Sequence, residues 1–376
     1  MLRQIKAYRS LLMLAVLVLF SQQTEAHPAS GIVVDSKGNV CFSDLETVWK
    51  IDLAGKLAVF RAGVRGRHVH ELAIDNQDNI FGADISYESQ KWISAVWKMT
   101  PNGLLSYLLE PTSDPPPGIS PWHDRHGNMY LIDQNNHTKT RTLLLRRAPD
   151  GTVTTLAGGA WGHVDGRGTA ARFGSVGGMI IAGDDSIYLT DGDSLRRVTI
   201  DGMVTTLARR LTARTSDDTP TLFGGDSGSL AGLSVSPGGA VFVADSGNRR
   251  VLKIKDGKAE VVVRSEPPFL PTGVAVTPTG DIYILEVGLT LPNVSSGPRV
   301  RKMTADGNVS TAATIGANRE ERSTPAVAVE KAGVLAELSL QFFYEGRVAR
   351  MVLLLNAPAV FGAVIIWRRR KKERSA

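Results

Sequence analysis

The sequence contains a single cysteine, Cys41, so no disulfide can form within the chain. An exported domain built from this chain must therefore be stabilised by packing and hydrogen bonds instead of covalent cross-links. With 376 residues, of which 43% are hydrophobic and 38 are glycine, the chain is long enough for a sizeable core and many turns.

Net positive charge is lacking from most of the chain. The formal charge is +6, but the first 26 residues carry +2 and the last nine carry +5, which leaves −1 for residues 27–367. Proteins that bind nucleic acid need a positively charged face. The sequence therefore predicts no nucleic-acid partner.

Familiar catalytic motifs are also lacking. The chain has no nucleophile elbow, no phosphate-binding loop and no recognisable serine–histidine pairing. Its histidines do not form a local metal-binding motif with the short, regular spacings of structural zinc sites. Any active site would have to be assembled from residues far apart in the sequence.

The dominant feature of the sequence is a motif that occurs six times. A small residue begins a mostly apolar run, a polar turn follows, and a β-rich run ends on an acidic residue thirteen positions after the start. The starting residues are Gly31, Glu71, Ser120, Gly178, Gly232 and Gly273, and the acids are Asp44, Asp84, Asp133, Asp191, Asp245 and Glu286. Six copies that superpose without a gap identify a repeat protein.

Each copy continues with a third apolar run, a turn containing glycine and a fourth run. The third runs are residues 48–51, 96–99, 144–147, 195–198, 251–254 and 300–303. Four short strands joined by tight turns form an antiparallel sheet, which needs neighbours to bury its faces. The period and strand number predict an all-β, six-bladed propeller of four-stranded antiparallel blades.

The fourth and fifth copies carry a resemblance to a known family. Residues 156–159, 165–168, 171–173, 187–191, 195–198 and 204–208, and the run Asp245-Ser246-Gly247-Asn248-Arg249-Arg250, resemble the NHL repeat. The resemblance covers residues 30–316 and implies a propeller. It leaves function open, because such propellers include binding modules, sensor ectodomains and lyases, and the related gluconolactonase-like and paraoxonase-like families are metal-dependent.

Both ends of the chain have the character of export and membrane segments. Residues 1–26 combine Arg3, Lys6 and Arg9 with a short apolar run and end at Ala26, which is the plan of a cleaved signal peptide. That apolar run is too short to span a bilayer comfortably. The sequence therefore predicts an extracytoplasmic propeller.

Residues 351–367 are uncharged and mostly apolar, and a basic tail follows at residues 368–376. Seventeen residues in a helix span about 26 Å, near the lower limit for crossing a membrane. Asn356 and Pro358 are unfavourable there, whereas the basic tail favours a cytoplasmic end. We therefore expect a single-pass transmembrane helix, joined to the propeller by a juxtamembrane linker at residues 317–350.

Cys41 falls at the position where the other copies have an aromatic residue. The counterparts are Phe81, Tyr130, Tyr188, Phe242 and Tyr283. This position lies in the second strand of each copy, so we expect Cys41 to be a small buried hydrophobic residue with no chemical role.

The start of the first strand and the end of the second lie at the same end of a blade, because the two strands are antiparallel. The six starting residues should therefore ring the mouth of the central channel, with the six acids behind them. Asp84 and Asp133 are candidate ligand-binding residues on this basis. For each acid, however, the favoured interpretation is a structural role in a turn, bonded to neighbouring backbone amides.

Departures from the repeat indicate where a specific site lies. Glu71 stands where the other copies have glycine or serine, and His70 precedes it, so both are candidate ligand-binding residues. His68, His137 and His163 should lie on loops at the same end. A divalent cation held by His68, His70, Glu71 and His163 is the candidate cofactor, because zinc needs three or four such ligands to converge.

The oxygen ligands that hold calcium in gluconolactonase-like and paraoxonase-like propellers are not matched here. Those families place Glu, Asn or Asp just before the small residue at the mouth. The corresponding residues of this chain are Ser30, His70, Ile119, Gly177, Ala231 and Thr272. Lactonase activity therefore does not carry over to any residue.

These observations favour a membrane-anchored, extracytoplasmic propeller that binds a protein or a small molecule at its channel mouth. Binding is preferred to catalysis. One alternative is a metal-dependent lyase or hydrolase with its site at the same mouth, and a second is a structural scaffold in an envelope complex.

Overall fold

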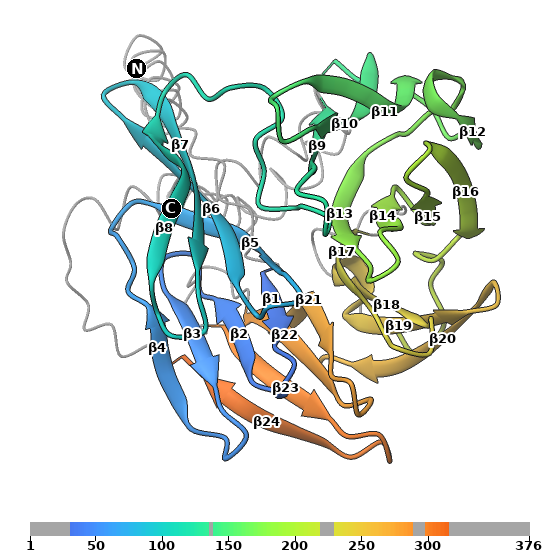
Figure 1. Ribbon diagram of the computed structural model, residues 1–376. Helices are drawn as coiled ribbons and strands as arrows, with labels where there is room; N and C mark the ends of the chain where they lie inside the picture. The colour runs from blue at the N-terminus through green and yellow to red at the C-terminus, as the bar shows by residue number, and fades with distance from the viewer. Residues whose placement is uncertain (1–30, 135–137, 219–228, 289–297, 316–376) are drawn as a thin grey trace, which may run out of the picture. The chain divides into compact units, whose positions relative to one another are not determined.

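The computed structural model describes residues 31–134, 138–218, 229–288 and 298–315. These residues form six antiparallel sheets arranged around a central axis (Figure 1). The fold is an all-β, six-bladed propeller, as the repeat predicts. We number the blades one to six in chain order.

Four blades consist of four consecutive strands each, with the first strand innermost. Blade one contains β1 (Ile32–Val34), β2 (Val40–Ser43), β3 (Val48–Ile51) and β4 (Leu57–Arg61). Blade two contains β5 (His68–Ile74), β6 (Ile80–Glu88), β7 (Lys91–Met99) and β8 (Leu105–Thr112). Blade five contains β17 (Leu230–Val235), β18 (Val241–Asp245), β19 (Arg250–Lys255) and β20 (Lys258–Arg264). Blade six contains β21 (Phe269–Val276), β22 (Ile282–Gly288), β23 (Arg299–Met303) and β24 (Val309–Thr314).

Blades three and four depart from the four-stranded plan. Blade three has three strands, and its expected first strand is reduced to an isolated bridge between His123 and Met129. Blade four has five strands, because a short strand from the preceding connection pairs with its outer edge. The strands of blade three are β9 (Met129–Gln134), β10 (Arg141–Arg147) and β11 (Val153–Ala160). Those of blade four are β12 (Gly166–Arg167), β13 (Val176–Ile181), β14 (Ile187–Asp191), β15 (Ser194–Val198) and β16 (Met203–Ala208).

The ring closes without a shared blade, because blades one and six each contain four strands of their own. The innermost strand β1 lies against both β5 of blade two and β21 of blade six. The third apolar runs of the sequence coincide with or lie within β3, β7, β10, β15, β19 and β23. The predicted register is therefore confirmed.

The second strands of blades one, four, five and six are mostly buried, because each lies between two strands of its own sheet and between two blades. All five residues of β18 are buried, and so are all four of β2. Cys41 in β2 is 2% exposed, and burial raises the pKa of its thiol to about 12. The expectation of a small, buried cysteine is confirmed.

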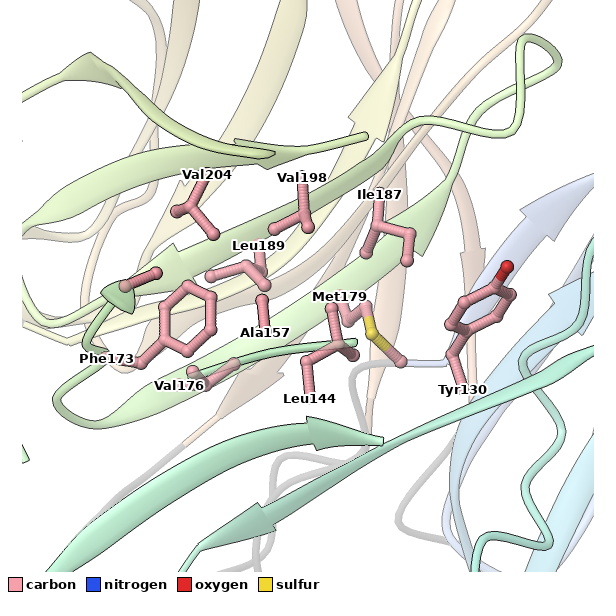
Figure 2. Close-up of a cluster of buried hydrophobic side chains, with 11 residues drawn as sticks. Tyr130, Leu144, Ala157, Phe173, Val176, Met179, Ile187, Leu189, Val198 and Val204 are labelled. Atoms are coloured by element: carbon pink, nitrogen blue, oxygen red, sulfur yellow. The ribbon is translucent and has the colours of Figure 1, made fainter. Parts of the chain in front are cut away.

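Apolar clusters join neighbouring blades at five of the six interfaces between blades in the ring. We call these interfaces seams. Blade pairs one and two, three and four, four and five, five and six, and one and six each share such a cluster. Figure 2 shows the cluster between blades three and four, where Leu144 packs with Met179 and Leu189. No comparable cluster joins blades two and three among the residues that the structure describes.

The predicted signal peptide, juxtamembrane linker, transmembrane helix and basic tail all lie outside the described residues. Within the described ranges, no helix is long and apolar enough to cross a membrane.

Candidate functional site

A small channel cavity lies on the propeller axis. It has a volume of about 90 Å³ and is lined by residues from the inner edges of all six blades. Since one water molecule occupies about 30 Å³ of liquid, the cavity holds a few waters or a small chemical group. Sites for drug-sized ligands begin at about 300 Å³, so a larger ligand would have to remain at the mouth.

The walls of this cavity are mostly glycine, valine, leucine, isoleucine and methionine. Glu71 is the one acidic residue among the described residues that line it. Its Oε2 accepts a hydrogen bond of 2.8 Å from Nε1 of Trp122 in blade three. Burial raises the pKa of the Glu71 carboxyl, while the hydrogen bond from Trp122 opposes that rise.

A bulge at the start of β5 presents Glu71 to the channel. The pairing of β5 with β6 shifts register between Val69 and Leu72, so His70 and Glu71 lie in the irregular stretch. Blades four, five and six have the same kind of shift at the start of their first strands. The repeat therefore supplies the bulge, and the substitution at position 71 places a carboxyl group on it.

Glycine at the equivalent position permits close packing of neighbouring blades. A Cβ atom on Gly31 would lie 2.9 Å from the backbone nitrogen of Leu72, and one on Gly178 would lie 2.5 Å from the carbonyl oxygen of Ala231. Both distances are shorter than a Cβ atom tolerates, so these positions accept no larger residue without movement of the next blade. Glu71 therefore marks the place where blade three cannot pack equally closely.

Blades two and three instead meet through polar and aromatic contacts. Besides the Glu71–Trp122 hydrogen bond, the rings of Phe81 and His123 lie 4.0 Å apart between centroids. His123 is held in place by a 3.0 Å contact between its Nδ1 and the Pro121 carbonyl oxygen. Trp122 and His123 both line the channel cavity, so this seam and the candidate site are one region.

The two histidines of β5, His68 and His70, lie close to Glu71 in the sequence. They contact each other and the backbone of blade one. His68 and His70 approach edge to face, with ring centroids 6.0 Å apart. The carbonyl oxygen of His70 accepts a 2.9 Å hydrogen bond from the backbone nitrogen of Gly31, which ties blade two to blade one.

His163 belongs to a different part of the ring. Its Nδ1 lies 3.2 Å from Oδ2 of Asp191, the acid that ends β14 of blade four. The structure does not bring His163 together with His68, His70 and Glu71. In the described ranges, no three His, Cys, Asp or Glu residues are grouped as a metal site would require. His137 lies outside those ranges.

Asp84 forms a hydrogen bond within blade two and a second one, part of an ion pair, to blade one. Its Oδ1 accepts a 2.8 Å hydrogen bond from Nε1 of Trp97, and its Oδ2 accepts one of 2.6 Å from Arg61 at the end of β4. The Asp84 side chain is 2% exposed, so its carboxylate is buried within these contacts. Asp133 is different, because its side chain is 41% exposed and forms a surface ion pair with Arg141.

The repeated acids mostly bind arginine, which differs from the backbone-amide contacts that the sequence predicts. Asp44 does accept hydrogen bonds from the backbone nitrogens of Glu46 and Thr47. Asp191 accepts a 2.7 Å hydrogen bond from the backbone nitrogen of Gly174. Asp191, Asp245 and Glu286 also form buried ion pairs with arginines of the following strand. The reason is burial, since a carboxylate that is removed from water needs a cation as well as hydrogen bonds.

Sequence reasoning missed Trp122 as the hydrogen-bond partner of Glu71. The equivalent residues of the other blades are Val33, Ala73, Ile180, Ser234 and Ala275, so Trp122 also departs from the repeat. Comparing the copies at this position would have identified it.

Solved structures with a similar fold differ widely from this chain in sequence. Virginiamycin B lyase from Staphylococcus aureus has a TM-score of 0.44 and 14% identity, and the match covers 78% of this chain and 86% of that chain. A luciferin-regenerating enzyme has a TM-score of 0.47 and 14% identity, covering 77% and 94%. A putative gluconolactonase has a TM-score of 0.43 and 14% identity, covering 68% and 84%.

Likenesses at these scores carry no argument about the function of this chain. No protein-family model and no curated protein matches it. Membership of the NHL-repeat family therefore remains a proposal, and the fold rests on the six sheets themselves.

Proposed function

We propose that this chain is a membrane-anchored, extracytoplasmic NHL-type propeller that binds a ligand or a partner protein at its channel mouth. The observation that carries the binding role is Glu71, a carboxyl group that replaces a small repeat residue and faces a cavity whose other lining side chains are mostly apolar. A buried carboxylate is costly unless a cation or hydrogen-bond donors face it. One donor, Trp122 Nε1, is already in place.

The chemistry of this site favours a cationic group as the ligand. An ammonium or guanidinium group would stabilise the ionised form of Glu71, and the apolar walls would accommodate a short aliphatic stem. The cavity of about 90 Å³ limits the inserted part to such a head group. The ligand is therefore a small amine, or a lysine or arginine side chain of a protein bound at the mouth.

The binding test uses n-butylammonium as the probe, with n-butyrate and n-butanol as controls of the same chain length. We expect n-butylammonium to raise the melting temperature of the full-length chain more than either control. The effect should be lost in Glu71→Gln, which keeps a hydrogen-bond acceptor for Trp122 but removes the charge. Glu110→Gln, an exposed acid on β8 of the same blade, is the matched control and should respond like wild type.

The pH dependence provides a second readout for the same site. A cation binds the ionised carboxylate, and burial raises the pKa of Glu71 above its usual 4.5. Affinity for n-butylammonium should therefore increase as the pH rises through that raised pKa. A probe effect that is unchanged in Glu71→Gln, or that weakens as the pH rises, would contradict the proposal.

The anchoring part of the proposal is supported by the sequence of residues 1–26, 351–367 and 368–376. Protease added outside intact cells should remove the propeller and leave a short basic fragment in the membrane. Recovery of protected, full-length protein from the cytosol would contradict this topology.

A further inference from the structure

The second blade carries a hairpin that extends beyond the channel mouth. Strands β6 and β7 remain paired as far as Glu88 and Lys91, whereas β14 and β15 of blade four end at Asp191 and Ser194. Figure 1 shows this blue-green hairpin as a long extension of blade two at the upper left of the view. At about 3.3 Å per residue, the four residues of β6 after Asp84 add roughly 13 Å.

The hairpin ends in a well-formed turn. Ser89 and Gln90 have φ values of 50° and 62°, so both adopt the left-handed conformation. Two such residues between paired strands form the type I′ connection, whose twist matches that of the strands. The projection is therefore a regular extension of the sheet.

Three large apolar side chains occupy one face of this hairpin. Tyr87 and Trp92 are cross-strand partners whose ring centroids lie 5.0 Å apart, and they are 51% and 46% exposed. Ile85, two residues before Tyr87 on the same face, is 37% exposed. Single exposed apolar residues are common, but an adjoining group at a projecting tip indicates an interaction surface. We call Ile85, Tyr87 and Trp92 the hairpin patch.

Basic residues lie in the hairpin and in the loop before β5, with Glu88 among them. Arg67, just before β5, lies 3.7 Å from Glu88 in an ion pair, which places the loop before β5 beside the hairpin. Arg65 in that loop and Lys91 in the hairpin are exposed. Aromatic side chains flanked by lysine and arginine match the boundary between acyl chains and anionic head groups.

The chain also leaves the propeller at the end from which the hairpin projects. Thr314, the last residue of β24, pairs with Arg299, which pairs with Glu286 at the mouth end of β22. Residues 316–350 then separate the propeller from the predicted membrane span. Thirty-five residues reach roughly 30–35 Å as a flexible coil and about 52 Å as a helix. Either length allows the hairpin tip to reach the bilayer.

We propose that the hairpin patch inserts into the interfacial layer of a membrane that contains anionic lipid. The proposal rests on the membrane anchor described under the proposed function. Trp92 and Tyr87 occupy the head-group region, with Arg65 and Lys91 near lipid phosphates, and the channel mouth is thereby held close to the bilayer. The hairpin then serves as a second point of attachment that sets the orientation of the propeller.

The test uses the full-length chain in vesicles of phosphatidylcholine and phosphatidylglycerol whose acyl chains carry bromine near the head groups. The emission of Trp92 is obtained as the difference between wild type and Trp92→Phe. We expect bromine to reduce this emission by about half or more, since an interfacial side chain lies within a few ångströms of the quencher. Arg65→Gln combined with Lys91→Gln should reduce the quenching.

Leu104→Ser is the matched control, because Leu104 is 69% exposed at the opposite end of the same blade. It should leave the quenching of Trp92 unchanged. Flotation of the vesicles separates the two possible failures. Protein that floats while Trp92 stays unquenched would overturn the hairpin proposal alone and favour a protein partner for the patch. Protein that does not float would overturn the anchor and the hairpin proposal together.

Discussion

The seam between blades one and six and the seam between blades two and three are built from different chemistry. Blades one and six are far apart in the sequence, yet they share an apolar cluster that includes Phe42, Leu285 and Val300, each 0% exposed. Blades two and three are consecutive in the chain, yet among the described residues they meet through the Glu71–Trp122 hydrogen bond and the Phe81–His123 ring contact and share no apolar cluster. Chain connectivity therefore does not determine how tightly neighbouring blades pack.

The difference follows from one position of the repeat. Where the first strand begins with glycine, as at Gly31 and Gly178, the next blade comes into backbone contact. Where it begins with Glu71, a carboxyl group occupies that space and faces the channel. At the seam between blades two and three, close packing is therefore replaced by a polar group on the propeller axis. A local departure of this kind from the rules of the fold is the pattern expected of a functional site.

The largest effect is expected at the apolar seam. Phe42→Ala removes a fully buried ring from the cluster that joins blades one and six, and should lower the free energy of unfolding by about 3–5 kcal/mol. Urea denaturation measures this change. Leu53→Ala, at a 75% exposed position of the same blade, should be nearly neutral. A loss below 1 kcal/mol for Phe42→Ala would mean that this seam is not closely packed.

A smaller effect is expected where glycine permits close approach. Gly178→Ala places a methyl group 2.5 Å from the Ala231 carbonyl oxygen, and should cost about 1–3 kcal/mol because blade five must move. Gly183→Ala is the control, since no atom lies within 4 Å of the added Cβ. Equal melting temperatures for the two variants would remove the packing explanation for the repeat's glycine.

At the polar seam, the Glu71–Trp122 bond is tested by a double-mutant cycle. Trp122→Phe leaves the half-buried Glu71 carboxyl group without its indole donor, and should cost about 1–3 kcal/mol. The same change in a Glu71→Gln background should cost less, because a neutral amide is easier to bury. Identical losses in both backgrounds would indicate that Trp122 contributes by packing alone.

The smallest effect concerns the ionisation of Glu71. Burial raises the pKa of its carboxyl group in the folded state above 4.5, so the folded protein binds more protons than the unfolded chain between those two values. Stability of wild type relative to Glu71→Gln should therefore fall as the pH rises from 4.5 through the raised pKa. Denaturation of both proteins across this pH range measures the difference. A relative stability that increases with pH would contradict the direction of the shift.

The sequence predicted the blades and their register because a propeller repeats one physical problem six times. Each copy must bury both faces of a small sheet, so the same apolar runs, turns and acids recur at the same spacing. Position 71 was informative for the same reason, since a charged residue in place of a small one is visible by comparison between copies.

Other features could not be predicted because they depend on contacts between copies. Arg61 of blade one reaches Asp84 of blade two, and Trp122 of blade three reaches Glu71 of blade two. Neither partner is fixed by spacing along the chain. The reduced first strand of blade three was also missed, although Pro121 within it removes a backbone donor that the strand would need.

The most direct test of this account is native-state hydrogen exchange of the full-length chain, which reports where the ring opens most easily. The account predicts that amides of β9 in blade three exchange before those of β1 and β21, because the seam between blades two and three lacks an apolar cluster among the described residues. Exchange that begins in β1 and β21, with β9 protected, would show that the ring opens where its chain ends meet and would contradict the account.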